Sequence, residues 1–388
     1  MNRWYFDHNA STPVSPEALD AFVDAARDVC GNASSVHREG QSAKQRLEAA
    51  RLQVCALLGC GPKELVLTSG GTESDNLAIL GAVRASRRSS KHVITTAIEH
   101  PAVLAACAQL EREGIEVTHV KPDRSGAVSA DSIAAAMRED TVLVSVMHAN
   151  NETGVIQPLA EIARVAHAAG ALLHSDGVQA AAKIAVDVRA LGVDLYAITG
   201  HKFGAPKGAG ALYVREGVEL QPMQFGGRHE RSRRPGTENV PGVAALGAAA
   251  EWARNNGSSE RIRLAALRDR FERGVLARVQ DVHVNGAGAD RVPNTSNLRF
   301  DGIDGEGMLI GLDLRGFAIS SGSACSSGAV EPSHVLTAMG LAAEEAKSSL
   351  RFSFGRGNDE EQTDRLIDAV AAMCAHLRRL SPTYAAAV

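Results

Sequence analysis

The sequence predicts an α/β protein with a mainly parallel β-sheet that is covered by helices on both faces. Two observations support this class. Short runs of apolar residues recur along the first two thirds of the chain, and segments with a 3.6-residue apolar period separate them. The runs are apolar throughout, which is typical of strands that are buried on both faces. With 388 residues, 45% of them apolar, the chain is long enough for two or three domains.

Six apolar runs of the first part are predicted strands of this sheet. They lie at residues 64–68, 92–97, 142–147, 171–175, 195–199 and 211–214. The amphipathic stretch PLAEIARVAHAAG, at 158–170, is one of the helices expected between them. In open sheets of this kind, ligands bind beyond the carboxyl ends of the strands. The residues that follow each strand are therefore the candidates for a functional site.

The pattern of elements changes after a helix predicted over 240–256. A long charged helix over 259–279 follows, and then come shorter strands and a last amphipathic helix. The predicted strands lie at 282–285, 295–300, 317–320 and 350–354, and the helix at 361–380. Because the polar stretch NNGSS separates the two long helices, we expect a domain boundary near residue 258.

The composition argues against several classes of protein. The formal net charge is -4, so we expect no nucleic-acid or membrane-surface partner. The chain has no run of about 18 apolar residues and no apolar leader segment at its start, which predicts a cytoplasmic protein without a membrane span. The six cysteines form no C-x-x-C pair, so neither a disulfide framework nor a metal site is expected.

The stretch SGGTESDN follows the first predicted strand and is a candidate phosphate site. Gly70 and Gly71 allow a tight turn, and a helix that begins at Thr72 would direct its free N–H groups and its positive dipole end towards an anion. The stretch fits neither a Walker loop nor a dinucleotide fingerprint, so a single phosphate is expected. A capped turn without a ligand would show the same pattern.

Two other strands are followed by an aspartate and a lysine. Asp176 follows 171–175, and Lys202, next to His201, follows 195–199. Together a lysine and a carboxylate can hold pyridoxal phosphate, the lysine as a Schiff base and the carboxylate against the ring nitrogen. A single lysine in such a loop would more often be a solvated charge, but the combination with the phosphate loop favours the cofactor site.

Three further polar residues are candidates on local grounds. His100 follows the strand at 92–97, where it could lie over a cofactor ring or cap the helix that starts at Pro101. Asn151 and Gln179 could bond to the ring hydroxyl or to substrate, or could satisfy the backbone of a turn.

The cysteine at 325 lies in a run of small residues. The stretch SSGSACSSG, at 320–328, surrounds Cys325 with serine and glycine, which suits a loop that moves. A loop cysteine by itself is more often incidental, because reactivity requires a lowered pKa or a neighbouring base.

These residues occur within motifs that resemble those of cysteine desulfurases, in the class V branch of the fold-type I pyridoxal-phosphate enzymes. The motifs occur in order from residue 6 to residue 356, so the resemblance is nearly full length. They are FDHNASTP, TSGGTESDNLAI, MHANNETGVIQP, HSDGVQAAAK, TGHKFGAPKGAGALYV, GGRHERSRRPGTENV, SSGSACSSGAVEPSHVL and SSLRFSFGR. The chain departs from the family pattern at Gly71, where alanine is common, and at Thr199, where serine is common.

The resemblance implies a role for each candidate residue. Lys202 would bind the cofactor aldehyde and act as the catalytic base, with His100 stacked on the ring and Cys325 as nucleophile. The other expected cofactor contacts are Asp176 at the ring nitrogen, Gln179 at the ring hydroxyl, Asn151, and Gly71, Thr72, Thr199, His201 and a second subunit's Thr237 at the phosphate. The last contact requires a homodimer. Asn151 and Arg351 would hold the substrate carboxylate, for which a guanidinium is suited.

The resemblance also implies the reaction and the domain plan. L-Cysteine would yield L-alanine, with its sulfur left on Cys325 as a persulfide for an iron–sulfur scaffold or another acceptor protein. The alternatives are a selenocysteine lyase, a transaminase, which has no need for Cys325, and a non-enzymatic scaffold. A large cofactor-binding domain is expected over 15–258, and a small α+β domain over 1–14 and 259–388 with the cysteine loop at about 320–331.

Overall fold

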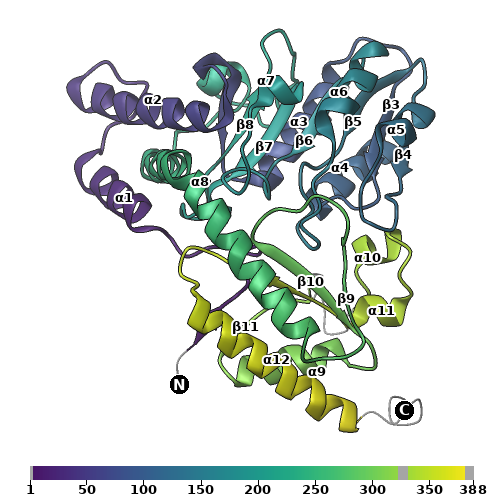
Figure 1. Ribbon diagram of the computed structural model, residues 1–388. Coiled ribbons are helices and arrows are strands. Elements are labelled where there is room, and N and C mark those ends of the chain that lie inside the picture. Colours follow the sequence, from purple (N-terminus) through teal and green to yellow (C-terminus); the bar gives the residue numbers. More distant parts are fainter. Residues whose placement is uncertain (1–2, 322–330, 381–388) are drawn as a thin grey trace.

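The computed structural model describes residues 3–321 and 331–380 and confirms an α/β fold with a mainly parallel sheet (Figure 1). The strands of the main sheet are β2 (Leu65–Thr68), β3 (His92–Thr96), β4 (Glu116–Val120), β5 (Thr141–Ser145), β6 (Leu172–Asp176), β7 (Leu195–Thr199) and β8 (Gly210–Val214). Their order is β2-β8-β7-β6-β5-β3-β4. Only β8 is antiparallel to its neighbours, so the other strands share one direction.

The six strands predicted for this sheet are all present, and β4 was missed. β4 lies at the edge of the sheet and pairs only with β3. Four of its five residues are exposed or half-buried, unlike those of β5 or β7, which are buried throughout. Because β4, unlike the strand β2 at the other edge, is not covered on both faces, it lacks the continuous apolar run that identified the others.

Successive residues of the strands contact two separate hydrophobic cores. On β7, Leu195 and Ala197 pack with residues of α3 (Gly71–Ala85) and α4 (Pro101–Arg112). Tyr196 and Ile198 point to the opposite face and pack with residues of α2 (Arg38–Leu58), α6 (Leu159–Ala168) and the first half of α8 (Val240–Leu276). This two-sided burial is the physical reason for the uninterrupted apolar runs.

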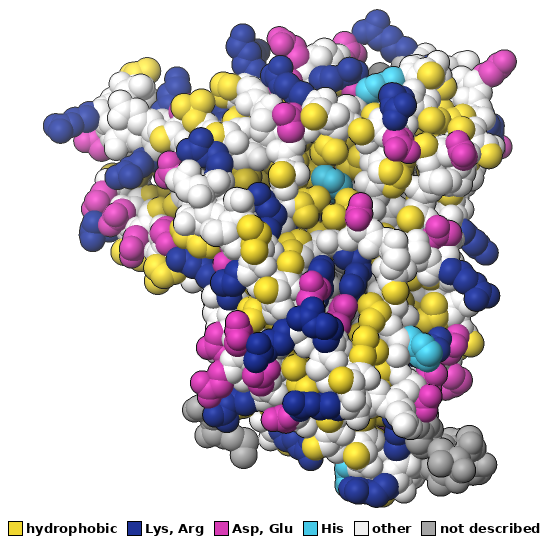
Figure 2. All heavy atoms as spheres, in the orientation of Figure 1, with side chains coloured by type: hydrophobic (Ala, Val, Ile, Leu, Met, Phe, Trp, Pro, Cys, Tyr) yellow, Lys and Arg dark blue, Asp and Glu magenta, His cyan; other side chains and the backbone are white. Residues whose placement is uncertain are grey.

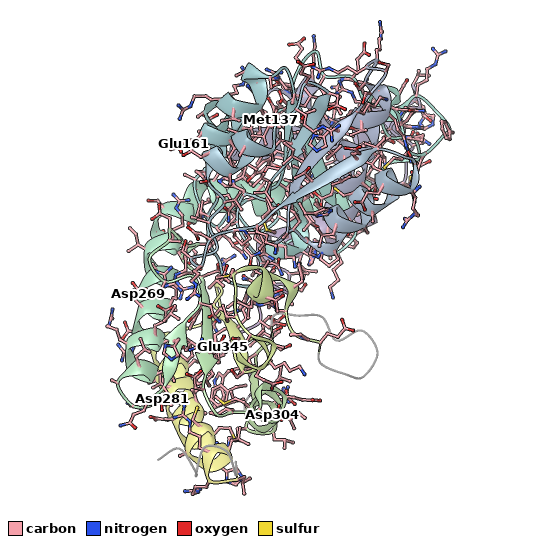
Figure 3. All side chains as sticks on the ribbon, turned by 90° about the vertical axis from the view of Figure 1, so that its right-hand side faces the viewer. Met137, Glu161, Asp269, Asp281, Asp304 and Glu345 are labelled. Atoms are coloured by element: carbon pink, nitrogen blue, oxygen red, sulfur yellow. The ribbon has the colours of Figure 1, made fainter. Side chains whose placement is uncertain are left out.

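A third core lies in the lower part of the molecule in Figures 1 and 3, at the end marked by Asp281 and Asp304. Its sheet is antiparallel, in the order β12-β10-β9, and its strands and helices are β9 (Val282–Val284), β10 (Thr295–Phe300), β12 (Ser349–Ser353), α9 (Gly305–Leu314) and α12 (Glu360–Leu380). The amino-terminal strand β1 (Trp4–Tyr5) pairs with β11 (Phe317–Ala318), and Phe6 is buried in this core.

The predicted break between two long helices was wrong, because α8 runs without interruption from residue 240 to residue 276. Its first half packs in the core beneath the main sheet and its second half in the third core. The polar residues between them are also helical, and two of their side chains bond to main-chain oxygens of the helix: Asn256 Nδ2 donates to Trp252 O (3.0 Å) and Ser259 Oγ to Asn256 O (2.9 Å). The domain boundary near residue 258 stays a prediction.

The remaining helices are short or lie at the periphery. They are α1 (Pro16–Asp28), α5 (Ala130–Ala136), α7 (Val188–Leu191), α10 (His334–Ala338), α11 (Ala343–Lys347) and the 3₁₀ turns η1 (Pro62–Glu64), η2 (Gly200–Lys202) and η3 (His229–Ser232). Within the described ranges, no helix combines the length and the apolar character needed to cross a bilayer. Basic and acidic side chains are intermixed on the face shown in Figure 2.

Candidate active site

A pocket of about 360 Å³ lies at the carboxyl ends of the parallel strands, where the third core meets the main sheet. It is lined by Asn9, Ala10, Gly71, Thr72, Asp75, His100, Met147, Asn151, Asp176, Val178, Gln179, Thr199, His201, Lys202, Ser320 and Arg351. Every predicted site residue except two is in this set. Thr237 is exposed and does not line the pocket of its own chain. Cys325 lies outside the residues that the structure describes.

Lys202 reaches the pocket from η2, the turn that follows β7. Its Nζ donates to the main-chain oxygens of Asn9 (2.6 Å) and Ala10 (2.9 Å). Burial, together with the charge of Arg351, lowers the pKa of Lys202 to about 8, although nearby carboxylates oppose this shift. A substantial fraction of the amine is therefore neutral near neutral pH, which is the form that attacks a carbonyl.

Asp176 is the last residue of β6 and is buried. Its Oδ1 accepts a hydrogen bond from Val178 N (2.9 Å). Burial raises the pKa of Asp176, and the charges of His100 and Lys202 oppose the rise. No lysine or arginine of ranges 3–321 and 331–380 forms an ion pair with it. A buried carboxylate with spare acceptor capacity beside a pocket fits a protonated ring nitrogen.

The amino terminus of α3 forms the other end of the pocket. Gly71 and Thr72 open this 15-residue helix; opposite lie Thr199, the last residue of β7, and His201 on the turn that follows. A Cβ at Gly71 would lie 2.8 Å from Val178 Cγ2, so a valine methyl fills the space that an alanine would need. Free N–H groups, the helix dipole and hydroxyl groups suit a phosphate.

His100 both caps a helix and lines the pocket, the two alternatives that the sequence left open. It is the N-cap of α4, and its Nδ1 accepts a hydrogen bond from Ala102 N (3.1 Å). It also lines the pocket, and burial is the main cause that lowers its pKa. Because Nδ1 accepts, Nε2 carries the proton of the neutral ring.

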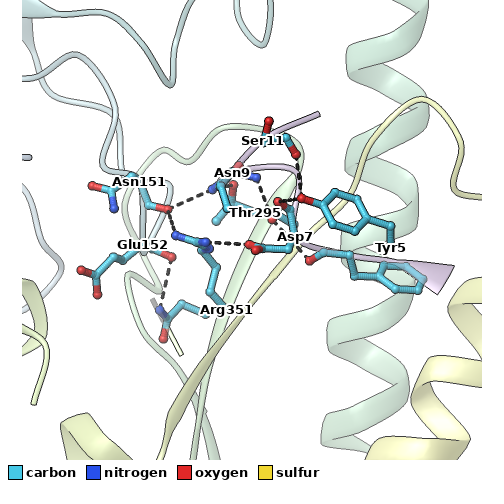
Figure 4. A network of polar contacts seen from close by, with 12 residues as sticks. Tyr5, Asp7, Asn9, Ser11, Asn151, Glu152, Thr295 and Arg351 are labelled. Atoms are coloured by element: carbon cyan, nitrogen blue, oxygen red, sulfur yellow. Dashed lines mark hydrogen bonds and ion pairs between the residues drawn. The ribbon is translucent and has the colours of Figure 1, made fainter. Parts of the chain in front are cut away.

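Arg351 extends from β12 into the pocket and is 4% exposed (Figure 4). Its Nη2 donates to Asp7 Oδ1 (2.7 Å) and its Nη1 to the main-chain oxygen of Asn151 (3.1 Å). Its Nε is buried and has no hydrogen-bond partner among the described residues. Arg351 lines the pocket, and the positive charge of its guanidinium there suits a substrate carboxylate.

Three polar residues of the pocket were not singled out from the sequence. Asn9 lies in the quoted FDHNASTP motif, but the position of its carbonyl group depends on contacts with residues far along the chain. Asp75 lies one turn after Thr72, and burial with the charge of Asp176 raises its pKa well above the ordinary value. The spacing on the helix could have indicated it. Ser320 pairs with Arg351 through the backbone, which no local pattern predicts.

The fold and this pocket agree with the family match. Residues 4–366 match the family described as Aminotransferase class-V. The chain belongs to this class, whose members generally depend on pyridoxal phosphate. Among its curated relatives, a cysteine desulfurase of Gluconacetobacter diazotrophicus is 47% identical, covering 98% of this chain and 96% of that protein. The cysteine desulfurase IscS of Methanosarcina thermophila is 44% identical, covering 97% and 93%. The chain is therefore a member of the cysteine desulfurase family.

Solved structures show the same fold. A NifS-like protein superposes with a TM-score of 0.90 at 33% identity, covering 97% of this chain and all of that one. DndA of Streptomyces lividans superposes with a TM-score of 0.76 at 40% identity, covering 89% and 97%. SspA in complex with cysteine gives a TM-score of 0.80 at 35% identity, covering 90% and 98%.

Proposed function

We propose that the chain is a pyridoxal-phosphate-dependent cysteine desulfurase that converts L-cysteine to L-alanine and transfers the sulfur to Cys325. The observation that carries the proposal is one pocket that brings together the half-buried amine of Lys202, the buried carboxylate of Asp176, the amino terminus of α3 and the Arg351 guanidinium from the third core. The curated relatives named cysteine desulfurase support the choice of substrate.

The residues of the pocket fit the cofactor. Lys202 would bind its aldehyde, Asp176 its ring nitrogen and Gln179 its ring hydroxyl, with His100 beside the ring. The phosphate would lie among Gly71, Thr72, Thr199 and His201. When bound, the cofactor supplies a ring that accepts electrons from the substrate's α-carbon.

The side chains of the pocket would orient the substrate and move its protons. Arg351, held by Asp7 and by the main chain of Asn151, would direct the positive charge of its guanidinium towards the substrate carboxylate. The amine of Lys202 would take the α-proton of the substrate, because its lowered pKa leaves the amine available as a base. The main-chain oxygens of Asn9 and Ala10 limit where that amine can lie.

The sulfur transfer would use Cys325 as nucleophile. Its thiolate attacks the substrate sulfur, an S–S bond forms, and the substrate C–S bond breaks. The electron pair of that bond stays with the carbon, which takes a proton and becomes the methyl group of alanine. The two sulfur atoms are thereby oxidised to a persulfide and the carbon is reduced, so no external oxidant is needed.

A homodimer is part of the proposal. Thr237 is exposed in its own chain, as expected for a residue that contacts a second subunit's phosphate. Large apolar side chains are exposed on α1 and α2 and in nearby loops, which would suit a second copy of the chain; they are Leu19, Val23, Val36, Leu52 and Phe225. The persulfide would pass to an acceptor protein such as an iron–sulfur scaffold. A cytoplasmic location stays a prediction.

The test is release of alanine and sulfide from L-cysteine in the presence of a reductant. We expect equal amounts of both products from the cofactor-loaded protein. Cys325→Ala should lose both while keeping the cofactor absorbance, and Lys202→Ala should lose products and absorbance together. Unchanged release by Cys325→Ala would contradict the persulfide step. Activity on L-selenocysteine alone would favour the lyase, and amino transfer to a keto acid would favour the transaminase.

A further inference from the structure

Lys183 is a buried lysine for which the reaction described above has no use. It is 7% exposed and lies on the turn that follows β6, four residues after Gln179. Its Nζ donates to Asn9 Oδ1 (2.7 Å) and to Gln179 Oε1. Burial, with the charges of Lys202 and Arg351, lowers the pKa of Lys183 well below its ordinary value. Its burial is costly, so a compensating function is expected.

The two bonds of Lys183 act on the direction of two amide groups. That of Asn9 is also set by Asn294 Nδ2, which donates to the same Oδ1 (3.2 Å). An amide can turn over and exchange its oxygen and nitrogen, and its partners decide the orientation. The amine of Lys183 donates to both oxygens, so the NH₂ groups of Gln179 and Asn9 must point away from it. Gln179 Nε2 then donates to the main-chain oxygen of Asn9 (2.9 Å), on the side that lines the pocket.

The hydrogen bonds of Asn9 connect this network with Lys202 and with the third core. Asn9 Nδ2 donates to the main-chain oxygen of Asn151 (3.0 Å) and to Thr295 Oγ1 (2.9 Å), as Figure 4 shows. The main-chain oxygen of Asn9 accepts from both Gln179 Nε2 and Lys202 Nζ. Asn9 is 1% exposed, so none of these bonds is readily replaced by water.

We propose that Lys183 is a positioning residue that holds the amide of Gln179 with its NH₂ group towards the pocket. The inference rests on the proposed function, because the group that receives this NH₂ would be the negative ring oxygen of the cofactor. Without Lys183, the amide can turn and present its oxygen to that negative charge, which is repulsive.

The consequence is a change in the proton affinity of the lysine-bound cofactor. An N–H donated to the ring oxygen stabilises the negative form of the ring, and this favours loss of the proton from the nitrogen that joins it to Lys202. Loss of that hydrogen bond should raise the pH midpoint of the absorbance change by about one unit. The other titratable groups that face Lys202 remain unchanged, namely Asp7, His100, Asp176, His201 and Arg351.

The experiment is a pH titration of the cofactor absorbance in the loaded enzyme and in five variants. Lys183→Met should raise the midpoint by about one unit. Gln179→Leu should raise it similarly, and adding Lys183→Met to Gln179→Leu should change it no further, because the residue through which Lys183 acts is gone. Lys207→Met, which removes an exposed lysine charge, should leave the midpoint unchanged.

Lys183→Gln distinguishes the effect of the donated hydrogen bond from the effect of the positive charge. The glutamine amide can still donate to Gln179 Oε1 but is never charged. It should keep the wild-type midpoint. A shift in Lys183→Gln, or shifts that add fully in the double variant, would overturn the proposal in favour of a purely electrostatic effect. If Lys183→Met does not fold, Lys183→Ala, which also removes the donor, takes its place with the same expected shift. Absence of any cofactor absorbance in the wild type would refute the proposed function instead.

Discussion

The ion pair of Arg51 with Glu230 offers the sharpest test of how tertiary contacts hold the site. Arg51 Nη2 and Nη1 donate to the two carboxylate oxygens of Glu230 (2.6 and 3.0 Å), and the side chains are 5% and 4% exposed. The pair also covers the open edge of β2: Arg51 Nη1 donates to Leu65 O (2.9 Å), and Glu230 Oε2 accepts from Leu67 N (2.9 Å). Strand β2 leads directly to Gly71.

The ion pair also anchors a backbone segment, beginning at Glu230, that has an unfavourable conformation. Glu230 and the next two residues have φ angles of 44°, 58° and 64°, which side-chain-bearing residues rarely adopt. The same loop continues to Arg234, whose Nε bonds to Glu73 (2.8 Å) in the first turn of α3, and then to Thr237. Release of Glu230 should therefore disturb the phosphate end of the pocket as well as the strand edge.

Arg51→Met would leave the Glu230 carboxylate buried without its cation. Breaking a buried pair in this way costs about 3–5 kcal/mol. We expect a loss of that size in the free energy of unfolding, measured by urea denaturation followed by circular dichroism, together with weaker cofactor binding. Arg51→Met/Glu230→Leu should recover much of the loss because no charge remains buried. A loss below about 1 kcal/mol, the value of an exposed pair, would refute this reasoning.

Three further predictions follow from the site. Cofactor uptake by the cofactor-free protein should rise with pH through a midpoint near pH 8, the pKa of Lys202; a midpoint near 10 would contradict its lowered pKa. Gly71→Ala should weaken cofactor binding about tenfold, measured by equilibrium titration, and Val178→Ala in addition should restore it, because the methyl clash is removed. Burial lowers the pKa of His148 to about 4, so this ring favours folding above pH 6.5 and loses that contribution as pH falls towards 4; His148→Gln should reduce the fall in unfolding free energy over this range.

Much of the fold could be predicted from the sequence, because burial of a strand on both faces requires a local run of apolar residues. The strands of the main sheet, apart from β4, are buried on both faces, so their apolar runs mark them. The error at 255–259 has the opposite cause. Asparagine, glycine and serine usually indicate a break, but the packing of both halves of α8 into separate cores keeps the helix continuous, at a cost of about 1 kcal/mol for the glycine.

The candidate site was predictable to the extent that its residues follow strands. Asp176, Lys202 and His100 come at or just after strand ends, and the carboxyl ends of parallel strands meet at one edge. The roles of Asn9 and Lys183 were not predictable. Their hydrogen bonds join residues 174 positions apart, and a buried lysine has no local signature that distinguishes it from a solvated one.

The sequence by itself determined which chemical groups the pocket holds and which helix points at it, because strand periodicity and glycine turns act over a few residues. The tertiary structure alone decided how those groups are oriented. Arg351 comes from a different core and meets Asp7 across 344 positions of the chain, and Asn9 holds Lys202 through its main-chain oxygen. Orientation depends on contacts between distant segments, and such contacts exist only once the cores have packed.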